Sequence, residues 1–140
     1  MGKGRFDHLI VPVAAAEDAE RTALALAAHL TTDQVTVVHV VEKAGGAPDK
    51  AGVEQREAAA EAAFDRFRQL YDGTVETAVV YDTNVADGLV SAAADAGADA
   101  IAFTPRGGGW FARVLTGNIT RDLIDDADRP IIVVPEEGSK

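Results

Sequence analysis

Short apolar runs alternate with amphipathic segments along most of this 140-residue chain. The runs are short and rich in β-branched residues, which is typical of buried strands. They cover Leu9–Val13, Val35–Val41, Val75–Tyr81, Ala98–Phe103 and Ile131–Val134. Most of these runs lack the alternation of a half-exposed strand, which favours strands covered on both faces, as in a parallel sheet.

The segments between the runs carry apolar residues at intervals of three and four, which predicts helices that each cover one face of the sheet. The first stripe consists of Ala23, Leu26, Ala27 and Leu30, the second runs over 60–71 and the third over 86–93. A fourth helix is expected over about 117–127. The chain therefore predicts an α/β fold, a doubly wound five-stranded parallel sheet sandwiched by four helices.

Length and composition limit the classes of protein to which this chain can belong. The chain has the usual size of one domain, and no linker or repeat divides it, so we expect a single domain over 1–140. It contains no cysteine, which excludes disulfides, thiolate metal sites and cysteine nucleophiles. Its apolar runs are far shorter than the ~18–20 residues that span a bilayer, so we expect no membrane insertion and a cytoplasmic location.

The charge balance is strongly acidic. The chain has 23 Asp and Glu against 13 Lys and Arg, a net charge of −10 and a sequence pI near 4.6. Free nucleic acid is a poor partner for such a surface. An acidic, lysine-poor surface also suits a salt-rich environment, where counterions screen self-repulsion. Adaptation to salt and an ordinary acidic protein are both compatible with this composition.

Ligands of open α/β sheets bind beyond the carboxyl ends of the strands, where the strand order reverses. The richest such segment here is 104–120, which contains three consecutive glycines at 107–109 together with Arg106 and Arg113. Glycines allow close approach of the backbone to a ligand, and arginines attract anions. Gly117 and Asn118 then open the predicted fourth helix, whose free N–H groups favour a phosphate. The alternative is a loop with an asparagine helix cap.

The sequence resembles the universal stress protein family over almost its whole length. The resemblance rests on LIVPV in the first strand, VTVVHVVE in the second and ADRPIIVVP at the end. The ATP-binding branch of that family carries the motif G-x2-G-x9-G followed by Ser or Thr, and Gly107 and Gly117 match its second and third glycines. The resemblance implies the strand order 3-2-1-4-5 of the adenine nucleotide alpha hydrolase-like fold.

Three positions depart from the family pattern. Thr104 stands where the motif has its first glycine, and Asn118 stands where it has its final Ser or Thr. Ala14 stands where relatives carry an acid after the first strand. The nucleotide- or anion-binding residues that the resemblance implies, in degenerate form, are Val13, Ala14, Val41, Thr104, Arg106, Gly107, Gly117, Asn118 and Ile119.

These departures leave two hypotheses. In the first, the chain is a non-catalytic stress-response binding module with a degenerate ATP motif, acting through its 104–118 loop and a protein partner. In the second, Gly107, Gly117 and Asn118 still hold ATP or AMP, and Arg106 replaces the lost contacts. No cofactor is certain under either hypothesis.

Catalytic and metal-binding patterns are sparse. The three histidines fall on different elements without a paired spacing, and His39 inside VVHVV is interpreted as a hydrogen-bonded structural residue. The serines have no histidine or acid at a recognisable spacing, so the sequence predicts no enzyme and no metal site. A cation site at Asp125, Asp126 and Asp128 is a weaker alternative to a solvated acidic surface.

The last strand predicts self-association. Residues Ile131, Ile132, Val133 and Val134 form an apolar run that should lie at an edge of the sheet. An apolar edge strand must be covered in a soluble protein, and pairing with the same strand of a second copy covers it symmetrically. Dimers of the family that the chain resembles are usually built in this way, so we expect a homodimer through this strand. The alternative is that Pro130, Pro135 and the acidic tail guard the edge in a monomer.

Overall fold

The computed structural model describes residues 4–42, 50–82, 85–104, 123 and 125–134. Their elements follow the order β1 (Gly4–Pro12), α1 (Ala16–His29), β2 (Leu30–Glu42), α2 (Lys50–Leu70), β3 (Thr74–Asp82), α3 (Val85–Ala96), β4 (Ala100–Phe103) and β5 (Ile131–Val133). Each described helix separates two strands, as the alternating sequence pattern predicts.

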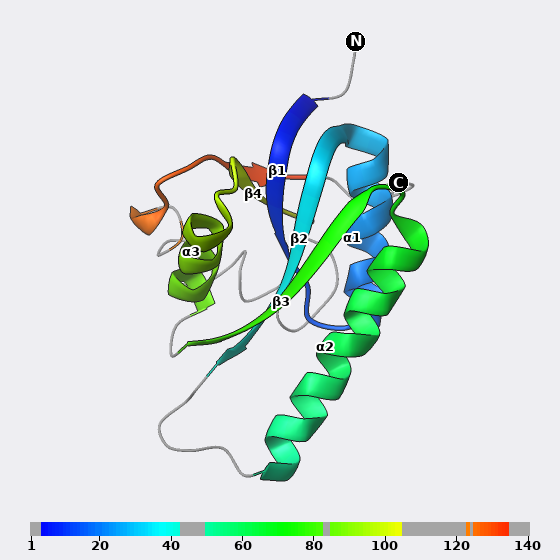
Figure 1. The fold of residues 1–140 in the computed structure, drawn as a ribbon, viewed down its shortest axis with the longest axis vertical. Coiled ribbons are helices and arrows are strands. Elements are labelled where there is room, and N and C mark those ends of the chain that lie inside the picture. Colours follow the sequence, from blue (N-terminus) through cyan, green and yellow to red (C-terminus); the bar gives the residue numbers. More distant parts are fainter. Residues whose placement is uncertain (1–3, 43–49, 83–84, 105–122, 124, 135–140) are drawn as a thin grey trace.

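The five strands form one parallel sheet in the order β3-β2-β1-β4-β5. The chain moves outward from β1 to β3, then crosses back to β4, so α1 and α2 cover one face and α3 covers the other (Figure 1). The predicted fold class and strand order are confirmed.

Three of the four predicted helices are described in full. Of the fourth, predicted over 117–127, Leu123, Asp125 and Asp126 are helical, and 117–122 and 124 lie outside the described residues. None of the helices in the described ranges is long and apolar enough to cross a membrane.

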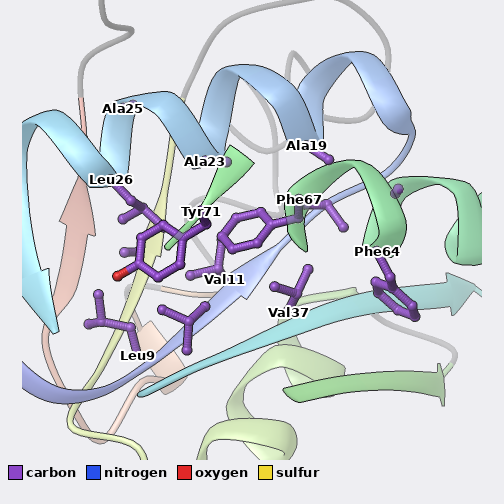
Figure 2. Packing of buried hydrophobic residues seen from close by; sticks show 14 of the residues in the cluster. Leu9, Val11, Ala19, Ala23, Ala25, Leu26, Val37, Phe64, Phe67 and Tyr71 are labelled. Atoms are coloured by element: carbon purple, nitrogen blue, oxygen red, sulfur yellow. The ribbon is translucent and has the colours of Figure 1, made fainter. Parts of the chain in front are cut away.

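Each face of the sheet buries its own core. Beneath α1 and α2, Leu9, Val11 and Val37 pack against Phe64 and Phe67 (Figure 2). The other face joins the sheet to α3 and to Leu123, and its buried residues are Ile10, Val38, Val40, Val85, Ala86, Leu89, Ala92, Ala93, Ala98, Ile101, Phe103 and Leu123. Burial on both faces explains why the central strands are continuously apolar.

The first two strands begin earlier than predicted. Gly4 pairs with Leu30 at the start of β1 and β2, whereas the apolar runs begin at Leu9 and Val35. Leu30 was predicted on the first helix, but its φ of −130° and ψ of 154° are extended, and it opens β2 directly after α1. A pattern based on apolar runs does not detect these extensions of β1 and β2, because most of their residues are polar.

Two side chains fix β4 and its flanking turns to the rest of the sheet. One oxygen of the Asp99 carboxylate accepts hydrogen bonds from the N–H groups of Asp7 and His8, at 2.8 and 3.1 Å. Arg129 donates from Nη1 to the carbonyls of Ala93 and Ala98, at 2.9 and 2.6 Å. The Asp99 contacts tie the start of β4 to β1, and the Arg129 contacts tie the segment before β5 to the turn between α3 and β4.

Helix α3 ends in a turn that requires glycine. Gly97 has a φ of +69°, and the N–H of Ala98 reaches back to the carbonyl of Ala93 at 3.0 Å, as in a Schellman motif. A Cβ at position 97 would meet no atom within 4 Å, so a substitution there strains only the backbone.

We expect Gly97→Ala to lower the free energy of unfolding by about 1–2 kcal/mol, because an L-residue is disfavoured at positive φ. Gly97→Asn should cost less, since asparagine tolerates this conformation. Urea denaturation of the three proteins measures the difference. Equal stability of Gly97→Ala and the unchanged chain would contradict the assigned turn.

Candidate functional site

The candidate site lies where β1 and β4 end side by side. The chain continues from β1 towards β2 on one side, whereas β4 lies on the other side, so the strand order reverses between them. This switch point is where open α/β sheets bind their ligands. The β1–α1 turn forms one wall, and Thr104, directly after β4, stands at the other.

Main-chain contacts fix the start of the β1–α1 turn. The N–H of Val13 donates to the carbonyl of Val38 at 2.9 Å, and the carbonyl of Val13 lies 3.1 Å from Nδ1 of His39. A carbonyl oxygen only accepts, so Nδ1 of His39 carries the hydrogen in this contact. The interpretation of His39 as a hydrogen-bonded structural residue is confirmed.

Asp18 closes the same turn from the first turn of α1. Its two carboxylate oxygens accept hydrogen bonds from the N–H groups of Ala14 and Ala15, at 2.7 and 2.6 Å. Ala15 is extended, with a φ of −150°, and lacks a side chain that could cap the helix. The acid three residues into the helix therefore satisfies the N–H groups of the cap residue and of the residue before it.

The Asp18 carboxyl is 6% exposed. Burial raises its pKa above the ordinary value of 3.8, because surroundings of low polarity disfavour the charged form. The N–H groups of Ala14 and Ala15 and the charge of Arg21 act in the opposite direction, and the effect of burial exceeds them. The turn thus holds a carboxyl group of the chain itself, hydrogen-bonded to the N–H groups of Ala14 and Ala15.

The described site residues from β2 and β4 are buried. Val41 lies near the carboxyl end of β2 and is 2% exposed. Thr104 is 1% exposed, and its hydroxyl oxygen has no hydrogen-bond partner among the described residues. A buried hydroxyl without a partner is costly, so Thr104 is a polar group available to a ligand or to a rearranged loop.

The structure brings together Val13, Ala14, Val41 and Thr104 at the carboxyl edge of the sheet. Five further candidate residues, Arg106, Gly107, Gly117, Asn118 and Ile119, lie outside the described residues. The arrangement of the glycine motif around the switch point therefore stays a prediction.

The acids at the end of the predicted fourth helix, Asp125, Asp126 and Asp128, are among the described residues. Within the described ranges no three His, Asp or Glu side chains gather as metal ligands. Asp128 is instead paired with Arg129, with Nε and Oδ1 2.7 Å apart.

Sequence reasoning missed Asp18. The signal that points to it is an acid at the third helical position after a turn, which is the acidic half of a capping box. The alanine at position 15 concealed the motif, because the usual serine or threonine cap is absent.

We expect Asp18→Ala to lower the free energy of unfolding by about 1 kcal/mol, as the loss of a helix cap does. Glu17→Ala is the matched control, because Glu17 is an exposed acid in the same turn of α1. Urea denaturation near neutral pH measures both. Equal losses for the two variants would mean that only charge near the helix end matters.

The raised pKa of Asp18 also predicts a pH dependence. Between 3.8 and the raised folded-state pKa, the folded chain binds more protons at Asp18 than the unfolded chain does. Its contribution to stability is therefore largest below 3.8 and is lost as the pH rises through the folded-state pKa. The unchanged chain should lose stability relative to Asp18→Asn across this window, and a constant difference would contradict the shift.

Comparisons with known proteins agree with the fold. The model of the universal stress protein family matches residues 5–135. UspA from Lactobacillus plantarum has a TM-score of 0.63 and 23% identity, over 94% of this chain and 99% of that one. No curated protein matches the sequence significantly.

Two similar structures contain nucleotides. The universal stress protein from Archaeoglobus fulgidus in complex with dAMP has a TM-score of 0.64 and 21% identity, over 91% of this chain and 97% of that one. A universal stress protein in complex with cAMP has a TM-score of 0.61 and 16% identity, over 92% and 97% of the two chains. At these identities the likeness shows a shared fold.

The strand order 3-2-1-4-5 agrees with the resemblance of the sequence motifs, and the family model matches residues 5–135. This chain therefore belongs to the universal stress protein family.

Proposed function

We propose that this chain is a non-catalytic regulatory member of its family, a cytoplasmic binding module whose nucleotide site is degenerate. In this proposal the 104–118 loop and the dimer surface recognise a protein partner. The proposal rests on the carboxyl edge of the sheet, where the features that would hold a nucleotide are altered.

The main support for this proposal is the β1–α1 turn, where the N–H groups of Ala14 and Ala15 already have hydrogen-bond partners. Ala14 offers no carboxylate to a ribose or base, and its N–H group already donates to Asp18 at 2.7 Å. The N–H of Ala15 is taken by the second Asp18 oxygen. A phosphate approaching this turn would meet a carboxylate instead of free donors, and like charges at short range repel.

Binding of ATP or AMP is the second candidate function. It is favoured by the dAMP and cAMP complexes of two structural neighbours and by the orphan hydroxyl of Thr104. In this case Gly107, Gly117 and Asn118 would supply the phosphate contacts, with Arg106 as the compensating charge.

Calorimetric titration with ATP and AMP separates the two candidates. We expect no heat of binding and no thermal shift at millimolar nucleotide, because position 14 carries no carboxylate and the N–H groups of Ala14 and Ala15 already donate to Asp18. The Archaeoglobus fulgidus protein, titrated with dAMP in the same buffer, is the positive control.

Submillimolar binding of either nucleotide would overturn the degenerate-site proposal. If Arg106→Ala then weakened the binding and Arg56→Ala did not, the second candidate would replace it. Arg56 is the control because its side chain is exposed on α2.

We also propose that the chain forms a homodimer through β5. This strand lies at one edge of the sheet, and Val133 is 53% exposed there. Its outer backbone groups have no strand partner among the described residues. Pairing with a second β5 would cover both the backbone and Val133.

Sedimentation equilibrium tests the dimer at micromolar concentrations. We expect a species of twice the 14.6 kDa chain mass, and conversion to monomer in Val133→Asp. Leu24→Asp is the matched control, since Leu24 is 41% exposed on α1 and should leave the dimer intact. A single 14.6 kDa species in the unchanged chain would exclude the dimer.

A further inference from the structure

A cavity of about 320 Å³ lies at the opposite edge of the sheet from the candidate nucleotide site. It opens where α1 passes into β2 and where α2 turns towards β3, at the amino ends of the strands (towards the top of Figure 1). The residues that matter here are Leu30, Thr31, Thr32, Leu70, Tyr71 and Asp72. Its volume falls within the range of small-molecule sites, ~300–1,000 Å³.

The cavity arises from a step in the sheet. On one side β2 pairs with β1 from Leu30 onward, whereas on the other side its pairing with β3 begins only at Gln34 and Thr74. The first residues of β2 therefore have no β3 neighbour, and alternate residues direct their N–H and carbonyl groups into the step. Thr31 and Thr32 lie in this stretch and line the cavity.

Tyr71 brings an unused polar group to the cavity. The residue is 9% exposed, and its ring packs on Phe67 with centroids 5.3 Å apart. Figure 2 shows the Tyr71 oxygen at the end of the ring turned away from Phe67. No described residue forms a hydrogen bond with this oxygen, which is not among the buried unpartnered atoms and is therefore open to solvent or to a ligand.

The charge of the cavity is negative. Asp72 is exposed at its rim, and no described residue forms an ion pair or hydrogen bond with its carboxylate. Both α1 and α2 end beside the cavity, and helix carboxyl ends carry partial negative charge. The nearby cation Arg68 is engaged by Asp65, with Nη1 and Oδ1 3.8 Å apart, and its other terminal nitrogen lies 3.5 Å from the Thr77 hydroxyl.

We propose that this cavity binds a small organic cation, an amine with a short apolar body. The ammonium group would pair with Asp72 and the helix carboxyl ends. The apolar body would lie against Leu30 and Leu70, and the hydroxyl of Tyr71 would satisfy a polar atom of the ligand. The site is separate from the carboxyl edge and independent of whether a nucleotide binds there.

Phenethylamine is a suitable probe, and 2-phenylethanol is its neutral counterpart. Titration of the full chain is followed by amide chemical shifts. We expect shifts at Thr31, Thr32 and Tyr71 with the amine, and much weaker binding of the alcohol. Asp72→Asn should weaken amine binding about fivefold, in line with the loss of one exposed ion pair.

Asp95→Asn is the matched control, because it removes the same charge from an exposed position on α3, on the other face of the sheet. It should leave binding of the amine unchanged. If both substitutions weakened amine binding equally, the amine would be attracted only by the net charge of the protein, and the proposal would be overturned. Absence of shifts at these residues with millimolar amine, or equal binding of the amine and the alcohol, would also overturn it.

Discussion

The hydrogen bonds from the N–H groups of Ala14 and Ala15 to the carboxylate of Asp18 govern how the carboxyl edge of this protein can be used. The N–H groups where a strand passes into a helix need hydrogen-bond partners. This chain satisfies them with its own anion. Under the proposed function, this carboxylate occupies a place that an incoming phosphate would need.

That contact depends on the placement of β1. His39 contacts the carbonyl of Val13 directly after the strand, and Asp99 accepts hydrogen bonds from the N–H groups of Asp7 and His8 within it. Between these points Leu9 and Val11 on one face and Ile10 on the other are fully buried. The strand is thus fixed at both ends and on both faces, which gives the turn that follows a defined position.

Most of the fold could be predicted from the sequence because buried parallel strands are continuously apolar and their helices are amphipathic. The early starts of β1 and β2 could not be predicted, since Gly4–His8 and Leu30–Gln34 are mostly polar and only their mutual pairing makes them strands. Leu30 fits a helical stripe equally well, and the packing of the two strands decides its conformation.

The sequence predicts the location of the candidate site at the carboxyl edge of the sheet, but it did not lead us to Asp18. Ala14 and Thr104 are departures that a comparison of motifs reveals. Asp18 was missed because Ala15 replaces the serine or threonine that usually marks a capping box, so only the acidic half of the motif is present in the sequence. The amino-edge cavity has no sequence signal either, since it results from the later start of β3 relative to β2.

The closure of the turn by Asp18 can be measured directly by a pH titration of the backbone amides. We expect the amide protons of Ala14 and Ala15 to shift together with the Asp18 carboxyl, at a midpoint above 3.8, and to stay unchanged when ATP is added at neutral pH. Amides that do not titrate with Asp18, or that move on addition of ATP, would contradict the occupied turn.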